Sequence, residues 1–124
     1  MNAATIVVAQ CDPRAAEQIA VRLYAHFDGV AIARNAEELR QLILKRRASA
    51  AIVDLELLSL GELVALRHDF PGVAFVCTHR VADEEMWAAA LDAGARDCCL
   101  TYDFDGIVAA AAQGPPQQSA HSAA

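Results

Sequence analysis

The sequence predicts an α/β domain in which a parallel sheet is covered by helices on both faces. Two observations lead to this prediction: short apolar runs rich in Val, Ile, Ala or Cys recur along the chain, and segments with helical periodicity separate them. The runs are continuously apolar, as is typical of strands buried on both faces. They cover residues 5–9, 30–33, 50–53, 73–77 and 98–100. With 124 residues, the chain has room for one such domain.

Helices are predicted between the runs, where apolar residues recur at three- and four-residue spacing. The positions are Ala16, Ile19, Ala20, Leu23 and Phe27 in the first segment, Leu39, Leu42 and Ile43 in the second, and Leu63, Val64 and Arg67 in the third. The segment after the fourth run, residues 86–91, has apolar residues on more than one face. One of those faces is therefore available to a partner.

Cap chemistry predicts where several of these helices begin. Pro13 suits a first helical turn, where its missing N–H is not needed. Asn35 with Glu38, and Ser59 with Glu62, both combine a capping residue with an acid three positions later. Each pair predicts a helix start.

Turns and the chain end are predicted from Gly, Pro and polar residues. Gly29, Gly94 and the stretch 70–72 each precede a strand by a few residues, which predicts turns there. We expect a domain over residues 1–112, followed by a flexible, polar, proline-containing tail or linker over 113–124 that is disordered from about Gly114 onward.

Composition and charge argue against several classes of protein. A net charge of −6 gives no basic field for DNA or RNA, because residues 45–47 form only a short basic cluster. The apolar fraction is 56%, much of it alanine, yet no apolar run is long enough to span a bilayer. The N-terminus has no basic segment that would start a secretion signal. We expect a cytoplasmic protein with no direct nucleic-acid or membrane partner.

The cysteines and the missing motifs argue against an enzyme or a metal protein. Cys11, Cys77, Cys98 and Cys99 form neither the paired spacing of a zinc site nor a secreted disulfide framework, so we expect reduced, packed thiols. No G-x-G-x-x-G, P-loop or G-x-S-x-G motif occurs. We therefore predict no enzymatic activity and no bound cofactor.

Asp54 is the most informative residue, because it ends a buried strand-like run and so places a lone carboxylate at the carboxyl edge of the sheet. Open α/β sheets bind and react with ligands at that edge. The other apolar runs should end around Asp54, so their last residues predict the chemistry of the site.

Four stretches along the chain together resemble the receiver domain of two-component response regulators over residues 5–112. They are Cys11-Asp12-Pro13, the run from Ala50 through Asp54 to Leu55, Val76-Cys77-Thr78-His79, and Leu91-Asp92-Ala93-Gly94-Ala95-Arg96-Asp97. The last matches the family's Ala-Gly-Ala-x-Asp signature. The resemblance implies a flavodoxin-like three-layer sandwich whose five-stranded parallel sheet has the order 2-1-3-4-5, with helices on both faces.

Carried over from the family, Asp54 is the phosphoacceptor candidate and Thr78 is the hydroxyl residue that would contact the phosphoryl group and report its arrival. The family's acidic pair falls on Gln10 and Cys11, and its lysine falls on Thr101. Two further positions depart from the family: its proline falls on Tyr102 and its switch aromatic on Cys98.

These departures bear on catalysis, because phosphoryl transfer to a carboxylate depends on positioning and charge neutralisation by Mg²⁺ and the lysine. Gln10 offers a neutral amide and Cys11 a soft thiol, whereas Mg²⁺ needs carboxylate oxygens. Weak metal candidates remain at Asp12, Asp54 and Glu56. In an alternative register of the first strand, Cys11 and Asp12 occupy the two acidic positions and restore one carboxylate.

The resemblance therefore implies an atypical receiver, or pseudo-receiver, that acts mainly as a phosphorylation-independent interaction module. Its partner would be another protein or a second copy of the chain. The family's usual partner surface would include Trp87, Leu91, Tyr102 and Phe104. One alternative is a working phosphoacceptor at Asp54, served by a histidine kinase and requiring Mg²⁺. A second alternative is a small-ligand or thiol-based sensor that uses Cys11 in the vacated pocket.

Overall fold

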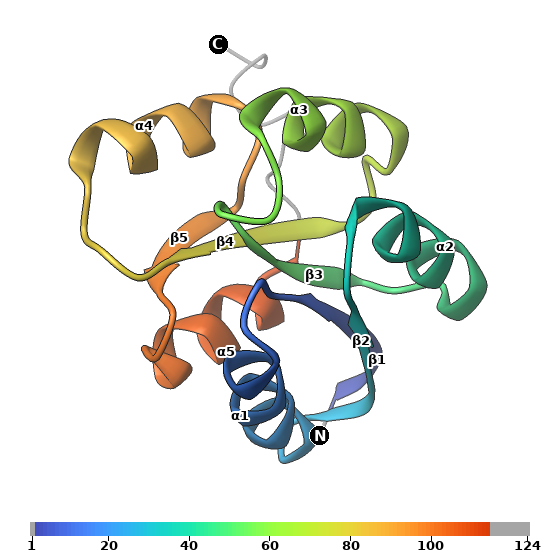
Figure 1. Cartoon of the computed structure of the whole chain (residues 1–124). Helices are drawn as coiled ribbons and strands as arrows, with labels where there is room; N and C mark the ends of the chain where they lie inside the picture. Colours follow the sequence, from blue (N-terminus) through green and yellow to red (C-terminus); the bar gives the residue numbers. More distant parts are fainter. Residues whose placement is uncertain (1, 115–124) are drawn as a thin grey trace, which may run out of the picture.

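The computed structural model describes residues 2–114, and within them five parallel strands form one sheet of order β2-β1-β3-β4-β5. This confirms the predicted order. The strands are β1 (Asn2–Ala9), β2 (Phe27–Ala33), β3 (Ala50–Asp54), β4 (Ala74–His79) and β5 (Asp97–Leu100). The helices are α1 (Pro13–Tyr24), α2 (Ala36–Arg46), α3 (Leu60–Asp69), α4 (Glu84–Asp92) and α5 (Phe104–Ala112). Helices α1 and α5 cover one face of the sheet, and α2, α3 and α4 cover the other (Figure 1).

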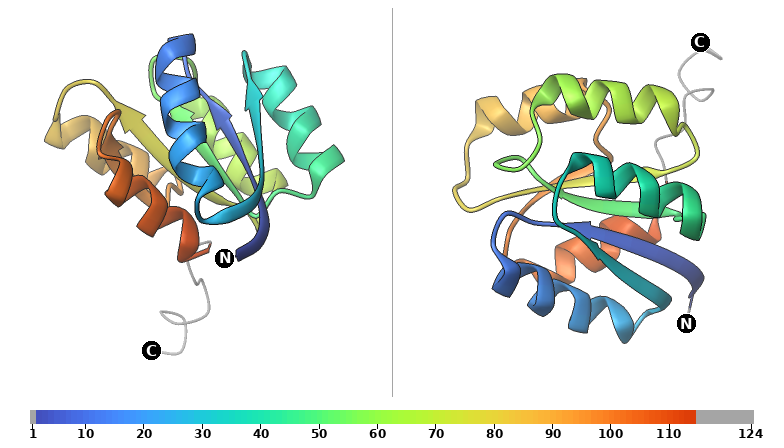
Figure 2. Two further views of the ribbon diagram at one scale, coloured as in Figure 1. Left: turned by 90° about the horizontal axis from the view of Figure 1, so that it is seen from below. Right: turned by 45° about the vertical axis from the view of Figure 1, so that its right-hand side comes forward.

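The sheet separates two apolar cores, because successive strand residues point to opposite faces. In β1, Val7 packs with α2, α3 and α4, whereas Val8 packs with α1 and α5. The views in Figure 2 show the sheet between these two helical layers. All five residues of β3 are buried, so the central strand carries Asp54 out of the apolar interior to its carboxyl end.

Strand β2 differs from the sequence prediction at its start. We expected Phe27 on the first helix and Gly29 in a turn, but α1 ends at Tyr24 and both residues lie in β2. The physical reason is packing: Phe27 is 2% exposed and belongs to the α1/α5 core. At Gly29, which pairs with Thr5, a Cβ atom would lie 2.9 Å from the Thr5 hydroxyl oxygen. Glycine thus allows close contact within the sheet rather than a turn.

The predicted helix starts are confirmed. Pro13 is the first residue of α1, and Ser59 with Glu62 forms a complete capping box at α3. Asn35 caps α2 through the Glu38 N–H, but the Glu38 carboxylate accepts from the Arg34 N–H rather than from Asn35. The second half of that box is therefore displaced by one residue.

The last helix ends at Ala112, where we expected the domain to end. The prediction of a disordered tail or linker falls mostly on residues 115–124, which lie outside the described residues. In the described part of the chain, no helix is long and apolar enough to cross a membrane.

Candidate functional site

A cavity of about 210 Å³ opens at the carboxyl edge of the sheet, beside the ends of β1, β3, β4 and β5. Its lining brings together most of the residues that the sequence singled out. They are Gln10, Cys11, Asp12, Asp54, Glu56, Thr101 and Tyr102, joined by Ala15 and Arg80. Thr78 lies behind this lining, fully buried and bonded to Gln10.

Asp54 is 7% exposed, and both of its carboxylate oxygens accept backbone hydrogen bonds. The Cys11 N–H donates to Oδ2 at 2.9 Å, and the Glu56 N–H donates to Oδ1 at 2.8 Å. Hydrogen bonds to an ionised carboxylate are stronger than those between neutral groups. The loops that follow β1 and β3 are therefore both tied to Asp54.

Gln10 and Thr78 form a buried pair beside Asp54. The Gln10 amide Nε2 donates to the Thr78 Oγ1 at 3.0 Å, and the hydroxyl lies 3.3 Å from the Gln10 Oε1, where it can donate in return. Gln10 is 5% exposed and Thr78 is 0% exposed. Since buried polar groups need partners, each residue satisfies the other without water or ligand.

The next two residues of the first loop point elsewhere. Cys11 is exposed and meets Asp54 through its backbone N–H. The Asp12 side chain caps α1, because its Oδ1 accepts from the Arg14 N–H at 2.9 Å. Gln10 is thus the side chain of this loop that is buried against the end of β4.

Arg80 is a pocket residue that the sequence reasoning missed. Its guanidinium forms a two-point ion pair with Glu56, with Nε–Oε1 at 2.6 Å and Nη2–Oε2 at 3.0 Å. The hydrogen bonds from Arg80 lower the pKa of Glu56, and the same contact raises the pKa of Arg80, to which Asp54 adds a smaller effect. The sequence does contain a signal for Arg80: it is a cation two residues after Thr78, at the predicted carboxyl edge of the sheet.

Thr101 and Tyr102 contribute neutral groups where the resemblance places lysine and proline. Thr101 is buried, and its N–H donates to the His79 carbonyl at 3.1 Å. The Tyr102 side chain is 54% exposed and meets Phe104 edge to face. Among the residues that line the cavity, the positive charge comes from Arg80 at its rim.

The residues present do not fit the Mg²⁺ site that the resemblance implies. The Gln10 amide is engaged with Thr78, Asp12 caps a helix, and the Glu56 carboxylate is paired with Arg80. Within residues 2–114 there is no group of three or more His, Cys, Asp or Glu side chains placed to hold a metal ion. A hard divalent ion would thus find too few free carboxylate oxygens.

The residues expected on a partner surface are not equally exposed. Leu91 and Tyr102 are 48% and 54% exposed. Trp87 is half-buried against the α2/α3/α4 core, and Phe104 against the α1/α5 core. Leu100, which the sequence reasoning did not single out, is also exposed on β5.

Comparison with solved structures identifies the fold. A response regulator from Thermotoga maritima is 19% identical, with a TM-score of 0.80 over 90% of this chain and 96% of the other. The receiver domain of Francisella response regulator 1452 is 16% identical, with a TM-score of 0.77 over 89% and 94%. The BeF3-activated receiver domain of Klebsiella pneumoniae RstA is 20% identical, with a TM-score of 0.75 over 88% and 95%.

No protein-family model matches the sequence, and no curated protein matches it. At these identities the structural likeness shows the fold: the chain has the receiver fold of response regulators.

The Gln10–Thr78 pair generates a stability prediction. We expect Gln10→Ala to lower the free energy of unfolding by about 1–3 kcal/mol, because it leaves the buried Thr78 hydroxyl without a partner. The double variant Gln10→Leu/Thr78→Val should recover most of this loss, since both polar groups are then removed. Urea unfolding measures both. Gln18→Ala, at an exposed position of α1, is the control, and an equal loss there would contradict the prediction.

The Glu56–Arg80 pair generates a pH prediction. Arg80→Ala should raise the pKa of Glu56 toward its ordinary value, as followed by carboxyl carbon NMR during an acid titration. Because the folded pKa lies below the unfolded one, the ion pair stabilises the fold above the unfolded pKa, and this contribution disappears as pH falls through the folded value. Arg34→Ala should move Glu38 instead. An unchanged Glu56 in Arg80→Ala would refute the pairing.

Proposed function

We propose that this chain is a receiver domain of two-component signalling that works as a protein-interaction module without being phosphorylated. One observation supports it above all: the groups that would accept and contact a phosphoryl group are already bonded to the chain itself. Asp54 accepts two backbone N–H groups, and Thr78 is paired with Gln10.

The charges of the pocket also disfavour phosphorylation. The transferred group needs its charge neutralised in the transition state. Thr101 lacks the ammonium that the resemblance places there, and a charge-assisted contact of that kind contributes about 1.5–3 kcal/mol, or ten- to a hundred-fold in an equilibrium. Gln10 and Cys11 in place of two carboxylates weaken metal binding as well. Both losses act on the same carboxylate.

The Gln10–Thr78 pair further suggests a single conformational state. The resemblance implies that the Thr78 hydroxyl turns toward a phosphoryl group on Asp54 and so signals that Asp54 is phosphorylated. Here the amide of Gln10 supplies a permanent partner at 3.0 Å, inside the protein. If the Thr78 hydroxyl keeps this hydrogen bond, it makes no additional contact in a phosphorylated state. Phosphate would then have no contact at Thr78 that favours one conformation of the domain over another.

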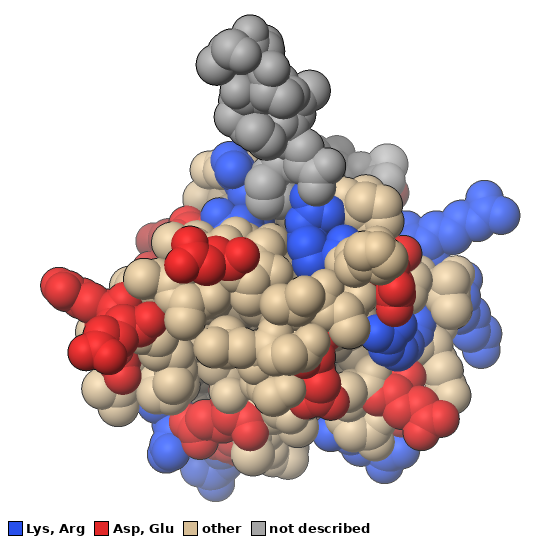
Figure 3. All heavy atoms as spheres, turned by 90° about the horizontal axis from the view of Figure 1, so that it is seen from above, with Lys and Arg blue, Asp and Glu red and all other residues tan. Residues whose placement is uncertain are grey.

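The partner surface would be the face formed by α4, β5 and α5, which we call the β5 face. Leu91, Leu100 and Tyr102 expose apolar groups there. Figure 3 shows acidic side chains gathered over the start of α4, where Glu84 and Glu85 follow the cap residue Asp83. A protein partner with apolar anchors and a basic rim fits this surface. A second copy of the chain could pair Leu91 and Tyr102, provided that the acidic side chains of the two copies stay apart.

A second candidate function is phosphorylation of Asp54 by a histidine kinase, and Arg80 is the observation in its favour. The Arg80 guanidinium lines the cavity and interacts electrostatically with Asp54. If Arg80 left Glu56, it could stabilise a phosphoryl group in place of the missing lysine. The kinase would then have to supply the remaining contacts.

Phosphorylation is tested with acetyl phosphate and Mg²⁺, followed by intact-mass analysis. We expect no stoichiometric gain of a phosphoryl group in the parent chain. The triple variant Gln10→Asp/Cys11→Asp/Thr101→Lys, which restores the missing charges, should become labelled, and adding Asp54→Asn should abolish that labelling. Labelling of the parent chain that disappears in Asp54→Asn would contradict the proposal. If this labelling is also lost in Arg80→Ala, phosphorylation of Asp54 with the help of Arg80 is established instead.

Self-association through the β5 face is tested by sedimentation at high protein concentration. If the partner is a second copy, the parent chain forms dimers and Leu91→Glu shifts it to monomer, because a buried charge at the interface is costly. Val21→Glu is the matched control, since Val21 is equally apolar and 68% exposed but lies on α1. A parent chain that stays monomeric throughout would eliminate the homodimer form of the proposal.

A further inference from the structure

Two buried cysteines face each other across the edge of the sheet. Cys77 in β4 and Cys98 in β5 are direct partners in the strand register. Both side chains belong to the core between the sheet and helices α2, α3 and α4, whereas Cys99 packs in the opposite core. Neighbouring strands lie about 4.8 Å apart. That spacing falls within the Cα separation of about 4.4–6.8 Å that a disulfide spans.

The two thiols have different chemical characters. The neighbouring Cys77 thiol lowers the pKa of Cys98, which favours the Cys98 thiolate. Its proximity to Cys98, together with burial, raises the pKa of Cys77. By contrast, burial raises the pKa of Cys99 to about 12. Within the pair, Cys98 is therefore the nucleophile and Cys77 the proton-bearing thiol.

Cys98 is also the more accessible of the two thiols from solvent. Cys98 is 8% exposed near the edge of the sheet, while Cys77 is fully buried beneath it. A small oxidant arriving from solvent meets Cys98 first, and the oxidised sulfur then has Cys77 as its nearest thiol.

We propose that Cys77 and Cys98 form a redox-modification site that a peroxide converts to an intramolecular disulfide. The Cys98 thiolate attacks one oxygen of hydrogen peroxide, which gives a sulfenic acid and releases hydroxide. The Cys77 sulfur then attacks the Cys98 sulfur and displaces its oxygen as water, with the Cys77 proton completing that water. Two thiols lose two electrons and the peroxide gains them. Two equivalents of a low-molecular-weight thiol reverse the reaction and are themselves oxidised to a disulfide.

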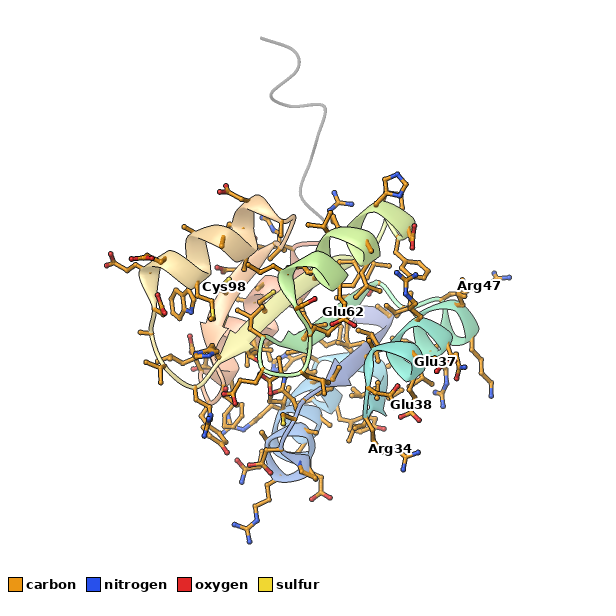
Figure 4. The ribbon with its side chains drawn as sticks, turned by 45° about the horizontal axis from the view of Figure 1, so that its top comes forward. Arg34, Glu37, Glu38, Arg47, Glu62 and Cys98 are labelled. Carbon is orange, nitrogen blue, oxygen red and sulfur yellow. The ribbon has the colours of Figure 1, made fainter. Side chains whose placement is uncertain are left out.

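Oxidation would be transmitted to α4. The Cys98 thiol lies 3.7 Å from the Trp87 carbonyl oxygen, to which it donates, and Figure 4 shows Cys98 next to this helix. A disulfide has no S–H group, so this contact to α4 is lost on oxidation. Because α4 also carries Leu91, the reaction would alter the β5 face. The redox site itself does not depend on the proposed interaction function.

The test uses the full 124-residue chain as the Cys11→Ser/Cys99→Ser variant, in which the pair is the only remaining source of thiols. The reduced protein is treated with one equivalent of hydrogen peroxide and then alkylated under denaturing conditions. We expect intact mass to show the loss of two hydrogens, no alkylation, and reversal by dithiothreitol. Peptide mapping should join the segments that contain Cys77 and Cys98.

Further measurements separate the pair from general thiol oxidation. Adding Cys77→Ala should trap Cys98 as an oxygen adduct with no disulfide. Trp87 is the only tryptophan, so its fluorescence should change on oxidation of the parent pair and return on reduction. The proposal is overturned if both thiols remain open to alkylation, or if the disulfides join separate chains. Disulfide formation and the fluorescence change are read from protein that keeps both cysteines, so the test stands even if the alanine variant fails to fold.

Discussion

The carboxylate of Asp54 lies where a fully buried strand leaves the core, and it must be stabilised there. The rest of the pocket depends on the hydrogen bonds that stabilise this carboxylate. At 7% exposure the group has lost most of its water. A desolvated charge is costly unless hydrogen bonds replace that water. The chain meets this need with N–H groups of Cys11 and Glu56, and so the loops after β1 and β3 take up their shapes around one side chain.

The changes around Asp54 are consistent with one another. Two acidic side chains beside Asp54 would repel it unless a cation were bound. With the neutral side chains of Gln10 and Cys11 at those positions, this repulsion is absent, which agrees with the proposal that the pocket works without a bound cation. The remaining charged pair, Glu56 and Arg80, neutralises itself at the rim.

Strand β4 connects this pocket to the β5 face. Its successive residues Cys77 and Thr78 point to opposite sides, one toward Cys98 beneath α4 and the other toward Gln10. The proposed oxidation of the thiol pair would therefore act on α4 while the pocket pair stays intact. Under both proposals, the domain would respond to an oxidant rather than to a phosphoryl group.

The sequence alone determined the features that depend on neighbours in the chain. Continuous apolar runs, caps such as Ser59 with Glu62, and the placement of Asp54 at a strand end all follow from local periodicity and short-range hydrogen bonding, and the order of the strands followed from the resemblance. The start of β2 was missed, because Phe27 continues a helical spacing yet packs into the core as a strand residue.

Only the tertiary structure decided which side chains meet. Gln10 and Thr78 are 68 positions apart, and Glu56 and Arg80 are 24 apart. Cys98 reaches Cys77 rather than Cys99 as its neighbour because strand register places side chains on one face or the other. Contacts of this kind depend on how strands align and loops close, and local patterns in the chain carry no record of that alignment.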